Sequence, residues 1–420
     1  MKNNILLGFA EVDITPSSNV QTVGFNRKDN LSRGILHRLF AQISVWHSNE
    51  GMCCLVAIDH IGFMCRDANL LRDEIGNKLG ITREKVMLCF SHTHSAPNIS
   101  LEPEYFNFLC KQILFGVSEA EKNTSSIKAV WGMAEADIGL NRRNAHGILD
   151  RRVGVLKIVD TDTKQLRLLI LRVTAHANVL LQDNFLISSD FFGVTRELLE
   201  EKYGCKVMIT QGASGNVKPK YNGSLEALDN MAFAIRDAIA TCVDSLKPNK
   251  INILSMFSQK ETFFADVPTL ERAKAISEEA MRENNIDGTQ WLEEVARLHN
   301  ENVKQQSVDI EIQYFIVDDG CFCGVANEIM CELAVNAVKA SSSNFFYFGG
   351  YTNGCDGYLP TAEEYDKGGY EVLHSYLIYY VYHGRVMPLN CDTSDKLVKT
   401  VAENWSGKKW KYGCLRKNRV

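Results

Sequence analysis

The chain has 420 residues, of which 45% are hydrophobic, 23% are charged and only 8 are proline. This composition is typical of a globular protein and excludes a disordered or fibrous one. Acidic and basic residues are interspersed and sum to a net charge of -5, which argues against nucleic acid or an anionic membrane as a partner.

The N-terminal segment lacks the features of a secretion signal. Its apolar run, residues 5–10, is shorter than a signal-peptide core, and Glu11 and Asp13 follow at once. No segment approaches the roughly 20 apolar residues that cross a bilayer. The 13 cysteines are an odd number and mostly scattered, which fits free thiols in a reducing compartment. We therefore expect a soluble, cytoplasmic protein without a membrane partner.

Three stretches of the sequence each predict a strand, a helix and a second strand that ends in a polar loop. In chain order these elements are 53–58, 66–79 and 86–90; then 166–174, 194–203 and 206–210; then 320–325, 330–339 and 345–348. Strands that alternate with helices of this length predict βαβ units, and their continuous apolar runs predict buried strands. The expected fold class is α/β, with mixed or mainly parallel sheets covered by helices.

The segment between the second and third units predicts helices rather than strands. Residues 269–304 are rich in Glu, Ala and Arg, with apolar residues at helical spacing and a break at 284–288. No linker rich in Gly, Ser or Pro divides the chain. We expect a single domain over 1–420, with a helical insertion at about 268–305 and a basic surface tail at 408–420.

Two histidines, His92 and His94, lie in the polar loop after the strand at 86–90. Residues two apart in an extended chain point to the same side, so both rings can face one pocket. Imidazole is the commonest zinc ligand, and a catalytic zinc has about three protein ligands and an open position. An H-x-H pair by itself is equally compatible with an ordinary loop.

Two further candidate ligands follow strands of the other units. His176 comes just after the apolar strand at 166–174, where a lone histidine is more often structural than a ligand. Sites in such sheets form at the carboxyl ends of strands. If His176 lies at the same end of the sheet as the His92 loop, it is a plausible further nitrogen ligand of the metal. Glu328 follows the strand at 320–325 and is expected to open a helix, where it serves either as an N-terminal helix acid or as a ligand.

Glycine-rich loops and two arginines complete the polar set. The loop 349–360 can bring its backbone close to a ligand or simply turn. Ser214 lies in the turn 211–219, which lacks both the G-x-S-x-G elbow and the Walker spacing, so we interpret this turn as the border of a pocket. Arg142 can orient a carbonyl or carboxylate through paired donors, whereas Arg143 is as compatible with a solvated turn.

Taken in order, these segments resemble the N-terminal catalytic domain of the neutral/alkaline (non-lysosomal) ceramidase family over nearly the whole chain. The segments that carry the resemblance are 8–16, 91–97, 141–142, 176–179, 188–193, 211–219, 357–365 and 368–371. The resemblance implies a zinc ion bound by His92, His176, Glu328 and Tyr358. It also implies that His94, Arg142 and Tyr370 surround the substrate carbonyl.

Two departures from the family change the expected mechanism and substrate. Lys218 stands where the family has a serine proposed as nucleophile, so we expect attack by a zinc-activated water. Lys218 is then a further candidate catalytic residue, or alternatively a surface lysine in a turn. The family's immunoglobulin-like C-terminal domain and its secretion signal have no counterpart in the sequence, so the expected substrate is a small soluble molecule.

These inferences combine into one prediction and two alternatives. The prediction is a zinc-dependent hydrolase that cleaves an amide (N-acyl) bond. The first alternative is hydrolysis of an ester or a glycosidic bond on the same metal. The second is a metal-binding or ligand-binding member of the family without catalysis.

Overall fold

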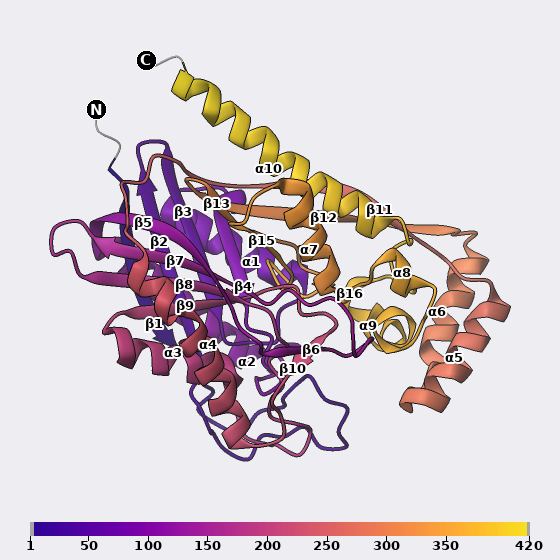
Figure 1. The fold of residues 1–420 in the computed structure, drawn as a ribbon. Coiled ribbons are helices and arrows are strands. Elements are labelled where there is room, and N and C mark those ends of the chain that lie inside the picture. Colours follow the sequence, from indigo (N-terminus) through magenta and orange to yellow (C-terminus); the bar gives the residue numbers. More distant parts are fainter. Residues whose placement is uncertain (1–3, 418–420) are drawn as a thin grey trace.

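The computed structural model describes residues 4–417, with side chains through Trp405, and its largest sheet has eight strands (Figure 1). Their order across the sheet is β4-β3-β2-β1-β5-β7-β8-β9. The strands are β1 (Leu6–Asp13), β2 (Phe40–Ser48), β3 (Gly51–Ile58), β4 (Val86–Phe90), β5 (Thr124–Glu135), β7 (Arg152–Asp160), β8 (Leu166–Val173) and β9 (Lys206–Gln211). The β3–β4 and β8–β9 pairs are parallel and the other pairs are antiparallel, so the sheet is mixed, one of the two forms that the sequence predicted.

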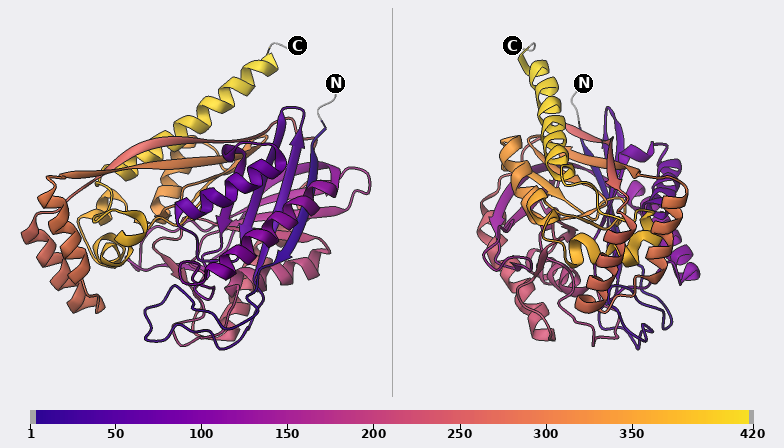
Figure 2. Two further views of the ribbon diagram at one scale, coloured as in Figure 1. Left: turned by 180° about the vertical axis from the view of Figure 1, so that it is seen from behind. Right: turned by 90° about the vertical axis from the view of Figure 1, so that its right-hand side faces the viewer.

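The eight-stranded sheet consists of two halves, and its inner face borders a buried core. Between β1 and β5, which join the halves, only the short ladder from Leu6 to Gly8 is paired. One buried cluster contains Leu55 of β3, Ile170 of β8 and Phe322 of a second, four-stranded sheet, so it lies between the large sheet and that second sheet. Alternate residues on a strand point to opposite faces, and the outer faces are covered by helices (Figure 2). These helices are α1 (Cys65–Leu79) and α2 (Pro103–Lys122) on the first half, and α3 (Asp190–Tyr203) and α4 (Leu225–Ser245) on the second.

A second sheet has four strands in the order β11-β12-β13-β15. Its strands are β11 (Leu254–Asp266), β12 (Gln305–Val317), β13 (Gly320–Gly324) and β15 (Phe346–Gly349). Two helices, α7 (Cys331–Ser341) and α10 (Thr393–Lys417), pack against it. The ring of Trp405 on α10 stacks on Phe346 of β15, with ring centroids 5.6 Å apart.

The three predicted βαβ units are confirmed. Helices α1, α3 and α7 connect the parallel pairs β3–β4, β8–β9 and β13–β15. The largest boundary error is at α3, which begins at Asp190 instead of residue 194. The Asp190 carboxylate accepts hydrogen bonds from the backbone N–H groups of Leu180 (3.1 Å) and Phe191 (2.8 Å), which ties the start of the helix to the preceding loop.

The predicted helical segment forms a hairpin of two helices, α5 (Leu270–Asn284) and α6 (Thr289–Asn300), between β11 and β12. Asn285 ends α5 in a left-handed conformation (φ 52°), within the predicted break. The apolar residues at helical spacing are buried on one face of the hairpin, with Ala273, Ile276 and Trp291 among them.

Short elements close the side of the molecule that carries the polar loops. They are β6 (Gly139–Asn141), β10 (Val217–Pro219), β14 (Glu328–Ile329), β16 (Tyr358–Leu359), α8 (Ala362–Tyr365), the π-helix η2 (Tyr370–His374) and α9 (Tyr376–His383). The 3-10 helix η1 (Arg83–Lys85) lies at the other end of β4, directly before its first residue. The expectation that Glu328 opens a helix is wrong, because Glu328 lies on β14 and α7 begins only at Cys331. The backbone N–H of Glu328 donates to Gly357 O (2.9 Å) and that of Met330 to Leu359 O (3.2 Å), so strand pairing with β16 precedes the helix.

Within residues 4–417, no helix has the length and apolar character needed to cross a bilayer. The twelve cysteines whose side chains are described are all free. The predicted surface tail, 408–420, falls where side chains are not described, and residues 418–420 lie outside the described residues altogether.

Candidate active site

The loop after β4 carries His92 in a left-handed backbone conformation (φ 63°). Its backbone N–H donates to His60 O (2.9 Å), and its ring Nδ1 donates to Ile61 O (2.6 Å). A non-glycine residue in a sparsely populated region costs about 1–3 kcal/mol and persists only where its surroundings hold it there. The two contacts hold His92 in place and leave its Nε2 directed at the interior.

His176 reaches the same place from the end of β8. It is fully buried (0% exposed), and its ring Nδ1 donates to Ser214 O (3.0 Å). The β4 and β8 loops are joined by Gln211, whose Nε2 donates to both Ser91 O (3.1 Å) and Ala175 O (2.8 Å). This bridge explains how two strands from different halves of the sheet bring their histidines together.

Glu328 and Tyr358 enter from the pair of two-residue strands. They are direct partners in the parallel β14–β16 ladder, and both are buried. The Glu328 Oε2 lies 3.3 Å from His92 Nε2 and 3.7 Å from His176 Nε2. The structure therefore brings three of the four predicted metal ligands into mutual contact and places the fourth beside Glu328.

The chemistry of these residues fits a bound metal ion. In both His92 and His176 a backbone carbonyl holds Nδ1–H, which is how proteins commonly orient a ligating imidazole. Among the described residues, His176 Nε2 has no hydrogen-bond partner although it is buried. Ligand atoms of His92, His94 and His176 all lie within 4.8 Å of one another. Burial, with a contribution from nearby Arg142, holds the pKa of His176 well below 6.5, so the ring is neutral at pH 7 and its lone pair is available.

His94 lies at the border of this cluster. Its ring is edge-on to Phe25, with centroids 5.0 Å apart, and 5.1 Å from the ring of His92. In the described part of the chain, His94 Nε2 has no hydrogen-bond partner. Burial and the neighbouring His92 lower the pKa of His94 well below its ordinary value, so it is a neutral base at pH 7.

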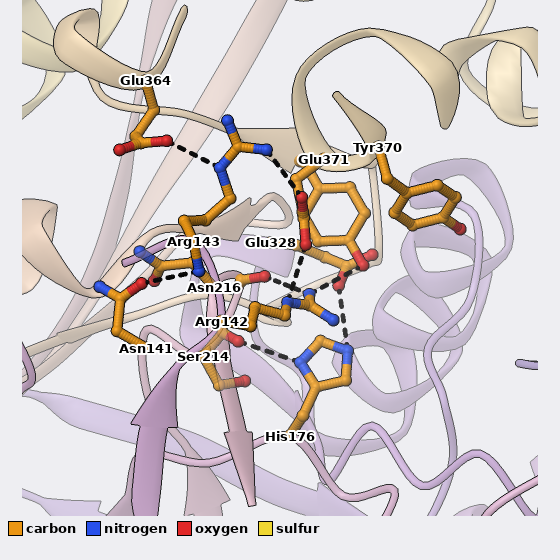
Figure 3. A network of polar contacts seen from close by, with 12 residues as sticks. Asn141, Arg142, Arg143, His176, Ser214, Asn216, Glu328, Glu364, Tyr370 and Glu371 are labelled. Carbon is orange, nitrogen blue, oxygen red and sulfur yellow. Dashed lines mark hydrogen bonds and ion pairs between the residues drawn. The ribbon is translucent and has the colours of Figure 1, made fainter. Parts of the chain in front are cut away.

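Arg142 connects Tyr358 to Glu371 of the π-helix (Figure 3). Its Nη2 donates to Tyr358 OH (3.2 Å) and to Gly215 O, and its Nε pairs with Glu371 Oε1 (2.9 Å). Tyr370 lies beside this network, with its ring centroid 6.1 Å from that of Tyr358 and its hydroxyl 3.4 Å from Tyr379 OH. The predicted substrate-facing residues Arg142 and Tyr370 thus surround Tyr358.

Arg143 is not in a solvated turn, the alternative left open by the sequence. Its Nε donates to Glu364 (2.7 Å) and its Nη1 to Glu371 (3.0 Å), and all three side chains are nearly buried. Arg143 therefore holds the carboxylate with which Arg142 pairs.

Lys218, also predicted as a site residue, has an exposed side chain that lies outside the histidine cluster. It is exposed on β10, between the buried residues Val217 and Pro219. Within the described residues it forms no hydrogen bond or ion pair with the histidine cluster or with Glu328.

Other carboxylates near the strand ends already have partners. Asp59 is paired with Arg196 (2.9 Å), and Asp190 accepts backbone N–H groups. A group on α5 and the π-helix, Glu279, Glu283 and His374, also has ligand atoms within 4.8 Å of one another. However, His374 already bonds Asn284 (2.6 Å) and Glu279 (3.2 Å) through its two ring nitrogens.

Sequence reasoning missed two residues of the site, Tyr351 and Glu371. Tyr351 is fully buried in the glycine-rich loop, and its hydroxyl donates to Glu328 Oε2 (3.3 Å). Glu371 is adjacent to the predicted Tyr370 but was given no role. Both closely follow a pair of glycines, Gly349-Gly350 and Gly368-Gly369, and that local composition was the available signal.

Comparisons with known proteins support the fold. No protein-family model and no curated protein matches the sequence. Among solved structures, neutral ceramidase from Pseudomonas aeruginosa is similar with a TM-score of 0.72 and 17% identity, over 98% of this chain and 75% of that one. A ceramidase complexed with C2 is similar with a TM-score of 0.73 and 16% identity, over 97% of this chain and 76% of that one. This chain therefore has a ceramidase-like fold along nearly its whole length.

Proposed function

We propose that the protein is a zinc-dependent hydrolase that cleaves an amide (N-acyl) bond of a small soluble substrate. One observation carries this proposal. The rings of His92 and His176 are each held by a backbone carbonyl through Nδ1, and both direct Nε2 at the buried carboxylate of Glu328. The ceramidase-like fold supports an amide bond as the target.

His92, His176, Glu328 and Tyr358 would hold the zinc ion. Imidazole nitrogens with oxygen donors are a ligand set that zinc accepts. When bound, zinc supplies a water of lowered pKa and polarises a carbonyl. The structural support for Tyr358 is its place beside Glu328 on β16 and its contact with Arg142.

The remaining roles belong to side chains around that cluster. His94 is neutral and its Nε2 lacks a partner among the described residues, so it can accept a proton and later donate it to the leaving amine. Arg142, held by Glu371, and the hydroxyl of Tyr370 would stabilise negative charge that develops on the carbonyl oxygen.

Metal analysis tests the centre. We expect about one zinc per chain in the wild type, and loss of zinc in both His92→Ala and His176→Ala. His299→Ala is a matched control, because this histidine lies on α6 and its Nε2 bonds Pro268 O (2.8 Å). Wild-type protein that binds no zinc, freshly purified or after zinc is added, contradicts the proposal.

The substrate is tested with three sets of small compounds: N-acyl amides, esters and glycosides, each with and without a chelator. We expect chelator-sensitive cleavage of the N-acyl set. Zinc binding without turnover of any set would favour the non-catalytic alternative, which is motivated by Lys218 at the position where the ceramidase family has the serine proposed as nucleophile. Lys218→Ala belongs in the same assay, and a loss of turnover there supports a catalytic role for this residue.

A further inference from the structure

The glycine-rich loop after β15 contains one fully buried polar side chain, Tyr351 (0% exposed). Its backbone is left-handed (φ 54°), and its carbonyl accepts the N–H of Phe90 at the end of β4 (3.0 Å). This anchor places its ring against that of His92, with centroids 4.4 Å apart, and its hydroxyl 3.3 Å from Glu328 Oε2. Tyr351 thus contacts two of the proposed zinc ligands from a strained position.

Ser214 lies in the turn after β9, and its side chain contacts the hydroxyl of Tyr351. It is fully buried, and its Oγ donates to the Tyr351 hydroxyl (3.0 Å). Its backbone carbonyl accepts Nδ1–H of His176 (3.0 Å). One residue therefore orients His176 through its main chain and Glu328 through Tyr351.

The hydrogen bonds run in a single direction. Each hydroxyl has one proton to donate: Ser214 donates to Tyr351, and Tyr351 donates to Glu328. Glu328 lies on a strand of only two residues, so few backbone contacts fix its side chain. Partners behind the ligands of a metal site fix their orientation, and losing one typically weakens metal binding about 10–100-fold.

We propose that Ser214 and Tyr351 are positioning residues of the metal centre, which orient Glu328 and His176 through a buried hydroxyl relay. The proposal rests on the proposed zinc site. It gives Ser214 a part in the site without making it a nucleophile.

The test is the zinc dissociation constant of Tyr351→Phe, measured by competition with a chromophoric chelator. This substitution removes only the hydroxyl, so we expect zinc to bind about 10–100-fold more weakly. Tyr347→Phe is the matched control, because Tyr347 is also buried but its hydroxyl bonds Gly132 O (3.0 Å) in another core. Affinity unchanged in Tyr351→Phe, or weakened equally in Tyr347→Phe, overturns the proposal.

Ser214→Ala separates the two parts of the relay, because it keeps the carbonyl that holds His176. We expect a smaller loss of zinc affinity, and a double variant with Tyr351→Phe no weaker than Tyr351→Phe alone. Additive losses overturn the relay. Thermal melting with far-UV circular dichroism checks that each variant is folded. If the proposed zinc site itself is wrong, the wild type also binds no zinc, and this outcome differs from unchanged or additive affinities in the variants.

Discussion

His92 and His94 are two residues apart and yet have different surroundings. His92 has Nδ1 fixed by a backbone carbonyl and Nε2 directed at Glu328. His94 packs edge-on to Phe25, and among the described residues its Nε2 has no hydrogen-bond partner. We infer that the first histidine is a ligand and the second exchanges protons with the substrate.

His94→Ala tests this division. We expect the variant to keep its zinc and to lose turnover by about 10²–10⁴-fold, the usual contribution of a general acid or base. Zinc content by elemental analysis and kcat on the best N-acyl substrate are the measurements. If His94→Ala loses zinc as completely as His92→Ala, His94 is a third nitrogen ligand.

Arg143 offers a prediction about stability. Arg143→Met leaves the carboxylates of Glu364 and Glu371 nearly buried and without this partner, so we expect a loss of about 3 kcal/mol in the free energy of unfolding. Arg143→Lys should recover part of it, because lysine keeps the charge but lacks the forked donors. Urea denaturation measures both, and equal stability of the methionine variant and wild type would falsify the prediction.

At the scale of elements, the π-helix η2 couples the site to the helical hairpin. It begins at Tyr370, includes Glu371, and ends at His374, which bonds Glu279 of α5 (3.2 Å). π-helical turns are rare and occur often at functional sites. The contact between His374 and Glu279 thus links α5 to the π-helix, whose Glu371 pairs with Arg142.

The start of α3 predicts a dependence of stability on pH. Burial raises the pKa of the Asp190 carboxyl from 3.8 to about 6. Below about pH 4 Asp190 is protonated in both the folded and the unfolded state. As pH rises from about 4 to 6 only the unfolded state loses the proton, so the folded state loses about 3 kcal/mol of stability.

Asp190→Asn has no such proton to lose. The difference in unfolding free energy between wild type and this variant should therefore shift against the wild type over that pH interval. Denaturation of both proteins at a series of pH values gives the measurement. A difference that stays constant with pH contradicts the assigned pKa.

At the scale of the whole molecule, one buried cluster joins the eight-stranded sheet to the four-stranded sheet. Trp46 of β2, Ile170 of β8, Phe315 of β12 and Tyr347 of β15 all belong to it. We infer that residues 1–420 form one domain, with α5 and α6 as an insertion that shares its core.

Unfolding experiments test this inference. Intrinsic fluorescence and far-UV circular dichroism should follow one coincident urea transition, because separate domains generally unfold in separate steps. Two transitions, or a stable proteolytic fragment that lacks the α5–α6 hairpin, would point to an independent unit.

The sequence alone determined the local elements and the loops that hold the chemistry. Continuous apolar runs that alternate with amphipathic helical segments identified the three βαβ units, because such patterns reflect local geometry. The strand 86–90 was predicted without error, and it places His92 directly in the following loop. His92 and His176 became candidates because each follows a predicted buried strand, and the resemblance to the ceramidase family then implied both as ligands.

The tertiary structure decided which of these residues meet. Composition does not distinguish parallel from antiparallel pairing, and of the seven neighbouring strand pairs in the large sheet five are antiparallel and two are parallel. Glu328 moved from an expected helix to β14 because its backbone pairs with β16. Tyr351, Glu371 and Arg143 gained their roles from partners distant in the chain, and such pairing depends on how the two halves of the sheet fold together, which no local pattern encodes.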